Sequence, residues 1–285
     1  MTVLGGIEAG GSKWECAVGT GPDDLRALET IPTTTPVETI DRVASFFERA
    51  GPVASLGIGS FGPVDADPDS PTWGYITSTP KPGWANTSVA QEIRSRVSVP
   101  VAFDTDVNAA ALGEHRWGAA QGLDTFCYVT VGTGIGGGGM AGGKLLHGFG
   151  HPEFGHMRIP HDLELDPFSG ACPFHGDCWE GLASGRALEQ RWGRSPAELD
   201  GDARVWNLQA HYLALGLVSV VYVLSPERIL IGGGVMRHPD LISLVQGEVE
   251  QLMNGYQHVP AIMLPALSPR SGVLGALALA QSAPA

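Results

Sequence analysis

The stretch Val3-Leu-Gly-Gly-Ile-Glu-Ala-Gly-Gly-Ser-Lys-Trp-Glu-Cys-Ala-Val18 decides the fold of this chain. Val3 to Ile7 and Trp14 to Val18 are apolar runs that predict two strands, and Glu8 to Lys13 form a glycine-rich turn between them. Glycines permit positive φ and expose backbone N–H groups, so the turn is suited to bind an anion. Taken alone, such a turn is more often a plain hairpin.

A second unit of the same kind appears later in the chain. Phe126-Cys-Tyr-Val-Thr-Val-Gly132 leads into Thr133-Gly-Ile-Gly-Gly-Gly-Gly-Met140, and a return segment lies near Lys144-Leu-Leu146. Neither turn matches the G-x-x-x-x-G-K-[ST] pattern, so the P-loop fold is not indicated. Alternating strand and helix patterns follow each copy, which predicts two related α/β lobes with phosphates bound in a cleft between their hairpins.

The composition is consistent with two lobes. The chain has 285 residues, 43% of them hydrophobic, with a mean hydropathy of +0.06, which is enough for two cores of ordinary size. We expect a small N-terminal lobe over residues 1–116, completed by a C-terminal helix at 270–285, and a large lobe over 117–269.

Several partners are not expected. The N-terminus has no basic segment followed by an apolar one, which predicts a cytoplasmic protein. The apolar run Leu213 to Leu224 is shorter than the roughly 20 residues of a membrane span, so it predicts a buried helix and no membrane partner. The net charge of −13, without a Lys/Arg cluster, argues against nucleic acid. Cys16 and Cys127 lie in segments with the pattern of strands, so we expect both to be buried free thiols.

A third glycine cluster, Ile231-Gly-Gly-Gly-Val235, follows the apolar stretch that begins at Arg228. It precedes a predicted helix from Pro239 to about Asn254. Such a strand-to-helix junction lets the backbone approach a planar ligand such as adenine, although a plain turn explains it equally well.

A pair of aspartates ends another strand. Val99 to Phe103 runs into Asp104-Thr-Asp106-Val-Asn108, and the alanine-rich segment that follows, Ala109 to Trp117, predicts a helix. Asp104 or Asp106 could cap this helix by accepting an N–H. In a phosphate-binding cleft, Asp106 could instead accept the proton of a substrate hydroxyl, with Asn108 orienting the substrate.

Cys172, His175 and Cys178 have C-x2-H-x2-C spacing, which is typical of a zinc site. A fourth ligand would come from upstream, and spacing alone does not choose among His147, His151, His156 and His161. The alternative is a pair of reduced core cysteines beside a surface histidine. With four protein ligands the zinc would be structural, because no position stays open for a reacting water.

Five segments together resemble the ROK family of sugar kinases, in order and over nearly the whole chain. They are Gly6–Lys13, Asp104–Glu114, Val131–Gly138, Glu153–His156 and Cys172–Gly185. The resemblance implies the two-lobed actin-like, hexokinase-like ATPase fold, with the active site in the cleft between the lobes. It also implies ATP, Mg²⁺ and a hexose substrate. Gly6–Gly11, Ser78–Trp84 and Cys172–Cys178 look most like the bacterial fructokinase branch.

The resemblance assigns roles by matching positions. Asp106 is the catalytic base, and the sugar contacts are Asn108, Glu153, His156 and Glu180. The zinc ligands are His156, Cys172, His175 and Cys178. The phosphates fall on Gly10, Gly11, Ser12 and Lys13 and on Gly132, Thr133, Gly134, Gly136 and Gly137, and the adenosine falls beside Gly232, Gly233 and Gly234.

The expected substrate is fructose, with glucose, mannose and N-acetylmannosamine as alternatives, and the expected assembly is a homodimer. A sugar-sensing repressor is disfavoured because only Met1 and Thr2 precede the first strand. Glu8 replaces the aspartate of many family members, and C-x2-H-x2-C replaces their C-x-C-x4-C. The fructokinase branch resembles this chain at both places. We further expect the stiff segment with Pro80, Pro82 and Trp84 to wall one side of the sugar.

Overall fold

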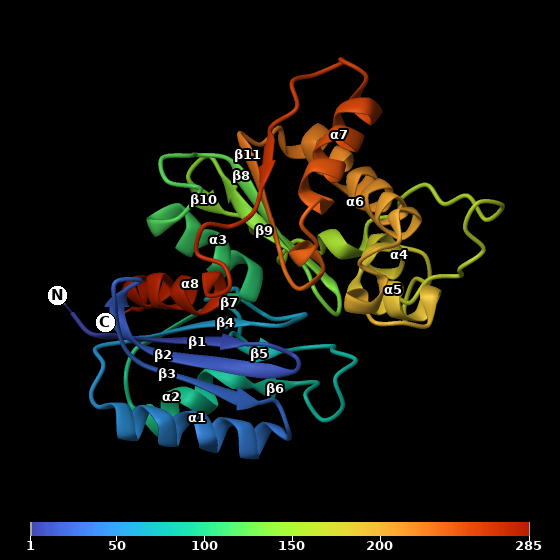
Figure 1. The fold of residues 1–285 in the computed structure, drawn as a ribbon. Coiled ribbons are helices and arrows are strands. Elements are labelled where there is room, and N and C mark those ends of the chain that lie inside the picture. Colours follow the sequence, from blue (N-terminus) through green and yellow to red (C-terminus); the bar gives the residue numbers. More distant parts are fainter. Residues whose placement is uncertain (1, 285) are drawn as a thin grey trace. The chain divides into compact units, whose positions relative to one another are not determined.

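The computed structural model describes residues 2–284, which form two compact units, each built on a five-stranded sheet (Figure 1). Unit 1 comprises the residues up to Gly122, the segment Leu145–His151 and the residues from Ala266 onward. Unit 2 comprises Leu123–Lys144 and Pro152–Pro265.

The sheet of unit 1 begins with the predicted hairpin. In spatial order its strands are β3 (Asp24–Pro32), β2 (Lys13–Gly21), β1 (Leu4–Ala9), β4 (Leu56–Ser60) and β7 (Val101–Thr105). β1 and β2 are antiparallel, as are β2 and β3, whereas β1, β4 and β7 are parallel. The two strands predicted on either side of Glu8 to Lys13 are therefore confirmed. A short ribbon of β5 (Tyr75–Ile76) and β6 (Thr87–Ser88) is separate from this sheet.

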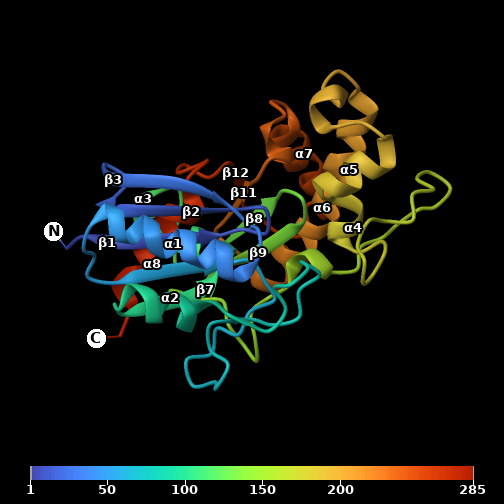
Figure 2. The same ribbon diagram turned by 90° about the horizontal axis from the view of Figure 1, so that it is seen from below.

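Helices cover both faces of the sheet in unit 1 (Figures 1 and 2). They are α1 (Pro36–Ala50) and α2 (Val89–Val97) on one face, and α3 (Asp106–Trp117), α8 (Ser271–Leu279) and the short η4 (Ala280–Ser282) on the other. α1 begins at Pro36 because Thr35 caps it, accepting a hydrogen bond from the N–H of Glu38. Its apolar residues recur on one face and bury Ile40 and Val43 against the sheet.

Glycines let α8 lie directly on its neighbours. A Cβ at Gly275 would lie 1.9 Å from the carbonyl oxygen of Ala109 in α3, and one at Gly57 would lie 2.0 Å from that of Ala276. Backbones can approach this closely only where no side chain intervenes. The contact fixes the axis of α3, whose first residue is Asp106.

The sheet of unit 2 repeats the same plan. Its strands, in spatial order, are β10 (Lys144–Leu145), β9 (Ile135–Ala141), β8 (Phe126–Val131), β11 (Arg228–Gly232) and β12 (Ala261–Met263). β8 and β9 form an antiparallel hairpin, and β8, β11 and β12 are parallel. Each unit thus joins one hairpin to parallel strands, as predicted from the two glycine-rich repeats.

The helices of unit 2 pack around α6. They are α4 (Trp179–Ala183), α5 (Gly185–Trp192), α6 (Ala203–Leu224) and α7 (Leu241–Met253), with short 3₁₀ turns η1 (Phe154–His156), η2 (Pro196–Leu199) and η3 (Val235–Arg237). α6 is long and apolar enough to cross a membrane, but half of its most apolar window is buried inside the unit. Trp206, Leu213 and Leu217 belong to the hydrophobic core, as expected of a core helix.

Candidate active site and metal centre

Two carboxylates lie at one edge of the sheet in unit 1. The parallel strands β1, β4 and β7 end at the same edge, where Glu8 pairs with Gly59 and Gly59 pairs with Asp104. Burial, together with the neighbouring carboxylates of Glu15 and Asp106, raises the pKa of Glu8 to about 7. The edge therefore concentrates negative charge that a bound cation would neutralise.

The start of α3 places Asp106 at this edge. Thr105, rather than Asp104 or Asp106, is the N-cap: its hydroxyl accepts the N–H of Asn108 at 3.1 Å. The alternative interpretation, in which Asp104 or Asp106 is the N-cap, therefore does not hold, because the intervening threonine has the extended backbone that a cap requires. Asp106 Oδ1 accepts the N–H of Val107 at 2.9 Å, and the residue is only partly buried.

Asp104 instead binds a distant segment. It is buried, and its Oδ1 accepts hydrogen bonds from the N–H of Thr105 at 2.7 Å and from Asn108 Nδ2 at 3.0 Å. Its Oδ2 lies 2.9 Å from His147 Nε2, and this contact raises the pKa of His147. Asn108 Nδ2 also donates to the carbonyl oxygen of Leu146 at 3.2 Å. The Asn108 amide hydrogens thus have protein acceptors.

Hydrogen bonds hold the first glycine loop. The N–H of Gly10 donates to the carbonyl oxygen of Lys13 at 3.0 Å, and the hydroxyl of Thr33 donates to the carbonyl oxygen of Gly10 at 2.7 Å. A Cβ at Gly10 would lie 2.6 Å from the Lys13 carbonyl oxygen, so the turn requires glycine. Lys13 is mostly exposed and pairs with Glu15.

Glu180 holds the second glycine loop. The N–H of Ile135 donates to Glu180 Oε2 at 3.0 Å, and a Cβ at Gly134 would lie only 2.4 Å from the same oxygen. The N–H of Gly132 donates to the carbonyl oxygen of Gly134 at 2.9 Å, which closes the turn. Gly136, unlike these turn residues, lies in β9 and pairs with β8. Glu180 is therefore already attached to the loop predicted to bind phosphate.

Glycines also bring η1 onto β9. A Cβ at Gly155 would lie 2.0 Å from the carbonyl oxygen of Ile135, and one at Gly137 would lie 2.3 Å from the Phe154 ring. This approach positions the ends of η1, where Glu153 precedes the turn and His156 completes it. Two of the residues predicted to bind sugar are thus carried by one short turn packed on the sheet.

The residues predicted to bind zinc come together. One ligand atom each from His156, Cys172, His175 and Cys178 lies within 4.8 Å of the others. His156 Nδ1 is 3.7 Å from both sulfur atoms and 3.3 Å from His175 Nδ1. The edges of a tetrahedron around Zn²⁺ with nitrogen and sulfur ligands are about 3.3 to 3.8 Å, so this donor set fits the ion.

The structure also decides among the four upstream histidines. His156 faces the cysteines, whereas His161 Nε2 lies 3.0 Å from the carbonyl oxygen of Asp166. His147 and His151 belong to unit 1. Burial and the adjacent Cys172 thiol raise the pKa of Cys178 to about 11, so a bound cation is needed to make the thiolate at neutral pH.

One hollow in unit 2 joins two of the predicted nucleotide segments. It has a volume of about 720 Å³ and is lined by Gly132, Thr133, Gly185, Arg186, Glu189, Ser195, Pro196, Ala197, Asp200, Trp206, Gly234, Val235, Arg237 and His238. Gly132 accepts the N–H of Gly185 at 2.7 Å, so the N-terminus of α5 lies directly against the second loop. The hollow carries two arginines and a helix N-terminus, which suit an anionic group, and also the carboxylates of Glu189 and Asp200.

Sequence reasoning missed most of the lining of this hollow. The rings of Trp206 and His238 stack with centroids 4.1 Å apart and make part of its wall. Arg186, Trp206 and the adjacent pair Arg237 and His238 come from three separate elements, and no spacing pattern links them. A signal existed only for Arg186, because it directly follows the matched segment that ends at Gly185.

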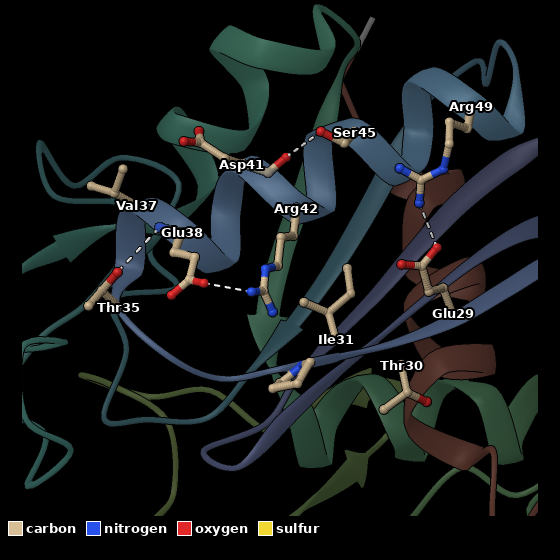
Figure 3. Close-up of a pocket in the computed structure, with 11 residues that line it drawn as sticks. Glu29, Thr30, Ile31, Thr35, Val37, Glu38, Asp41, Arg42, Ser45 and Arg49 are labelled. Atoms are coloured by element: carbon tan, nitrogen blue, oxygen red, sulfur yellow. Dashed lines mark hydrogen bonds and ion pairs between the residues drawn. The ribbon is translucent and has the colours of Figure 1, made fainter.

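A second hollow, of about 660 Å³, lies between β3 and α1 in unit 1 (Figure 3). Its two arginines point toward carboxylates: Arg42 donates to Glu38 at 2.6 Å and Arg49 to Glu29 at 2.7 Å (Figure 3). Because these cations are neutralised, and Asp41 adds a further negative charge, the hollow does not suit a phosphate.

The segment expected to wall the sugar exposes Pro80 and Pro82 but not Trp84. The Trp84 side chain is fully buried in the core of unit 1, and its indole N–H donates to the carbonyl oxygen of Thr34 at 2.9 Å. The ring packs against Trp14 and Phe61. A proline-flanked tryptophan is compatible with either location, and the free energy gained by burying so large a ring decides it.

Each unit joins one hairpin to parallel strands, which is the topology of the actin-like ATPase fold found in the matching solved structures. The chain belongs to the ROK family, whose model matches residues 4–283. It is 44% identical to a protein of Bacillus subtilis named putative fructokinase, over 99% of this chain and 96% of the relative. It is also 44% identical to the fructokinase of Zymomonas mobilis, over 99% of this chain and 97% of the relative.

Among solved structures, a ROK family glucokinase from Streptomyces griseus, in complex with glucose and AMPPNP, matches with a TM-score of 0.82. It is 26% identical, and the match covers 98% of this chain and 99% of that one. The family and the fold predicted from the five matching segments are therefore confirmed.

Proposed function

We propose that this protein is an ATP-dependent hexose kinase that converts fructose to fructose 6-phosphate. The observation that carries the proposal is the 44% identity to fructokinases over 99% of the chain. The site supports it, because a carboxylate at a strand-to-helix junction and a hollow with two arginines are what phosphoryl transfer requires.

Asp106 is the general base. Its carboxylate accepts the proton of the sugar hydroxyl as that oxygen attacks the γ-phosphorus, and the bond to the leaving ADP oxygen breaks. The backbone N–H of Val107 fixes the carboxylate through Oδ1. Glu8 lies close enough to repel Asp106, which favours cation binding at this edge of the sheet.

The hollow in unit 2 binds the donor nucleotide. Gly132, Thr133 and Gly134 offer a tight turn to the phosphates, with Arg186 and Arg237 as counter-charges, and Gly232 to Gly234 border the adenosine. In unit 1, Gly10 to Lys13 complete the phosphate contacts. Mg²⁺ bound with ATP would neutralise phosphate charge, and Glu8 is the carboxylate of unit 1 that would hold it or its waters.

Zn²⁺ in the site of His156, Cys172, His175 and Cys178 is structural. With Nδ1 of His156 turned toward the metal, Nε2 is directed elsewhere and is available for a sugar hydroxyl or a carboxylate. The ion would thereby orient the turn that also carries Glu153. A loop containing Pro173 and Gly176 has little secondary structure of its own to do so.

Asn108, Glu153, His156 and Glu180 bind the sugar hydroxyls. Hydroxyls placed differently in glucose, mannose or N-acetylmannosamine would leave a buried acceptor unpaired, at a cost of roughly 1 to 3 kcal/mol. That is enough for preference rather than exclusion. We place the enzyme in the cytoplasm as a homodimer.

The test is phosphorylation of a panel of hexoses with ATP, with Asp106→Asn as the matched control. We expect the highest kcat/KM for fructose, and a loss of about 10²- to 10⁴-fold in kcat for Asp106→Asn with sugar binding retained. A clear preference for glucose would refute the fructokinase assignment alone. Near wild-type turnover by Asp106→Asn would refute the base assignment.

A further inference from the structure

Two histidines connect the segment Leu145–His151 to the rest of unit 1. His147 Nε2 lies 2.9 Å from Asp104 Oδ2, and the N–H of Val64 donates to His151 Nε2 at 3.0 Å. The chemistry of the partners assigns opposite roles to the two rings: His147 Nε2 carries a proton and donates, whereas His151 Nε2 accepts. The segment is thus held at two separate points.

The His147–Asp104 pair is built as a structural contact rather than a chance surface pair. Asp104 has only 4% of its side chain exposed, so its carboxylate needs partners for both oxygens. Thr105 and Asn108 donate to Oδ1, and His147 is the partner of Oδ2. Removing His147 would leave one oxygen of a buried charge without this partner.

The pair also sets the position of Asn108. The Asn108 amide donates to Asp104 Oδ1 and to the carbonyl oxygen of Leu146, the residue next to His147. The positions of both acceptors depend on His147. Its ring holds the Asp104 carboxylate, and it is the neighbour of Leu146 in the segment Leu145–His151. The orientation of the Asn108 amide, two residues after Asp106, therefore follows from the His147 contact.

We propose that His147 is a positioning residue for the sugar. Through Asp104 it holds the segment Leu145–His151 and the Asn108 amide in the arrangement that receives the sugar. The proposal rests on the proposed function, in which Asn108 binds the sugar and Asp106 is the base.

The test compares His147→Ala with His147→Gln and with a control, His258→Ala, which removes an exposed histidine of unit 2. Loss of a hydrogen bond to a buried charge typically changes an equilibrium by about 10- to 100-fold. We expect His147→Ala to raise the KM for the sugar at least 10-fold, with the KM for ATP within about twofold of wild type. His147→Gln should recover most of the loss, because its amide nitrogen can reach Asp104. His258→Ala should match wild type.

A double-mutant cycle with Asp104→Asn separates this role from general destabilisation. The His147→Ala effect on sugar affinity, measured by calorimetry without ATP, should shrink about 10-fold once Asp104 is neutralised. Additive effects, or a KM for ATP that rises as much as that for the sugar, would overturn the proposal. Asp106→Asn is assayed in parallel: full turnover there rejects the base, while the calorimetric result for His147 still stands.

Discussion

Replacing Glu114 is expected to destabilise unit 1 in graded steps. The side chain is fully buried in α3, and each carboxylate oxygen accepts two hydrogen bonds. Oε1 accepts from the N–H of Leu267 and the hydroxyl of Ser271, both at 2.9 Å. Oε2 accepts from the N–H groups of Ala119 at 2.8 Å and Ala266 at 3.1 Å. One carboxylate thus joins the end of α3 to the segment that leads into α8.

The magnitude follows from which donors lose their acceptor. In Glu114→Gln, the new amide nitrogen can donate to Ser271 Oγ, while the amide oxygen keeps the donors at Ala119 and Ala266. Only the Leu267 N–H is left unpaired, at a cost of about 2 kcal/mol. Glu114→Ala leaves every donor unpaired and should cost about 4 kcal/mol or more. Ser271→Ala removes one donor and should cost about 1 kcal/mol.

Urea unfolding and amide hydrogen exchange measure this series. We expect the loss of unfolding free energy to increase in the order Ser271→Ala, Glu114→Gln, Glu114→Ala. Amide exchange should become faster at residues 264–274 and, in Glu114→Ala, also at Ala119. Exchange in α7 of unit 2 (Leu241–Met253) is the internal reference. The reasoning fails if Glu114→Gln lies within about 0.5 kcal/mol of wild type, or if Glu114→Ala costs no more than Ser271→Ala.

Three further changes test other parts of the structure. Cys172→Ser combined with Cys178→Ser should remove zinc and lower Tm, because metal binding stabilises that loop; finding no zinc in the wild-type protein by elemental analysis would contradict it. The pKa of Glu8 is about 7 in the folded protein and near 4.5 in the unfolded chain. The protonated carboxyl therefore adds to the unfolding free energy below pH 4.5, and this contribution is lost as the pH rises through 7. Glu8→Gln should therefore raise the unfolding free energy by up to about 3 kcal/mol at pH 8 and by little at pH 5, measured by urea unfolding. Gly275→Ala should lower Tm, since its Cβ would lie 1.9 Å from the Ala109 carbonyl oxygen; an unchanged Tm would show that α8 can shift.

The hairpins and the start of α3 were predictable because their signals are local. Glycine turns between apolar runs need only neighbouring residues to be recognised, as in Gly10 to Lys13 and Gly132 to Gly134. The alanine-rich sequence after Asn108 predicts a helix by propensity alone. The resemblance to the ROK family added roles, but the local pattern had already placed Asp106 where a strand ends.

Long-range contacts could not be predicted in the same way. Asp104 looked like a helix cap, yet its partner is His147, 43 residues away, and no spacing rule predicts that pair. Spacing left four histidines as candidate metal ligands. The family resemblance assigned His156, and the packing of η1 on β9 explains why this histidine reaches the cysteines. The burial of Trp84 depends on its contact with Trp14, which lies far away in the sequence. The residues around Trp84 therefore did not reveal that it is buried.

Glu180 shows how the two substrates could be linked within unit 2. One of its carboxylate oxygens accepts the N–H of Ile135 and fills the space beside Gly134, so the side chain determines the shape of the second glycine loop. If its other oxygen binds the sugar, as proposed, a single residue would contact one substrate and hold the loop for the other. His147 differs because its contacts lie in unit 1 and concern Asp104 and Asn108. Substitutions of Glu180 should therefore weaken the binding of both substrates, whereas substitutions of His147 should weaken the binding of the sugar alone.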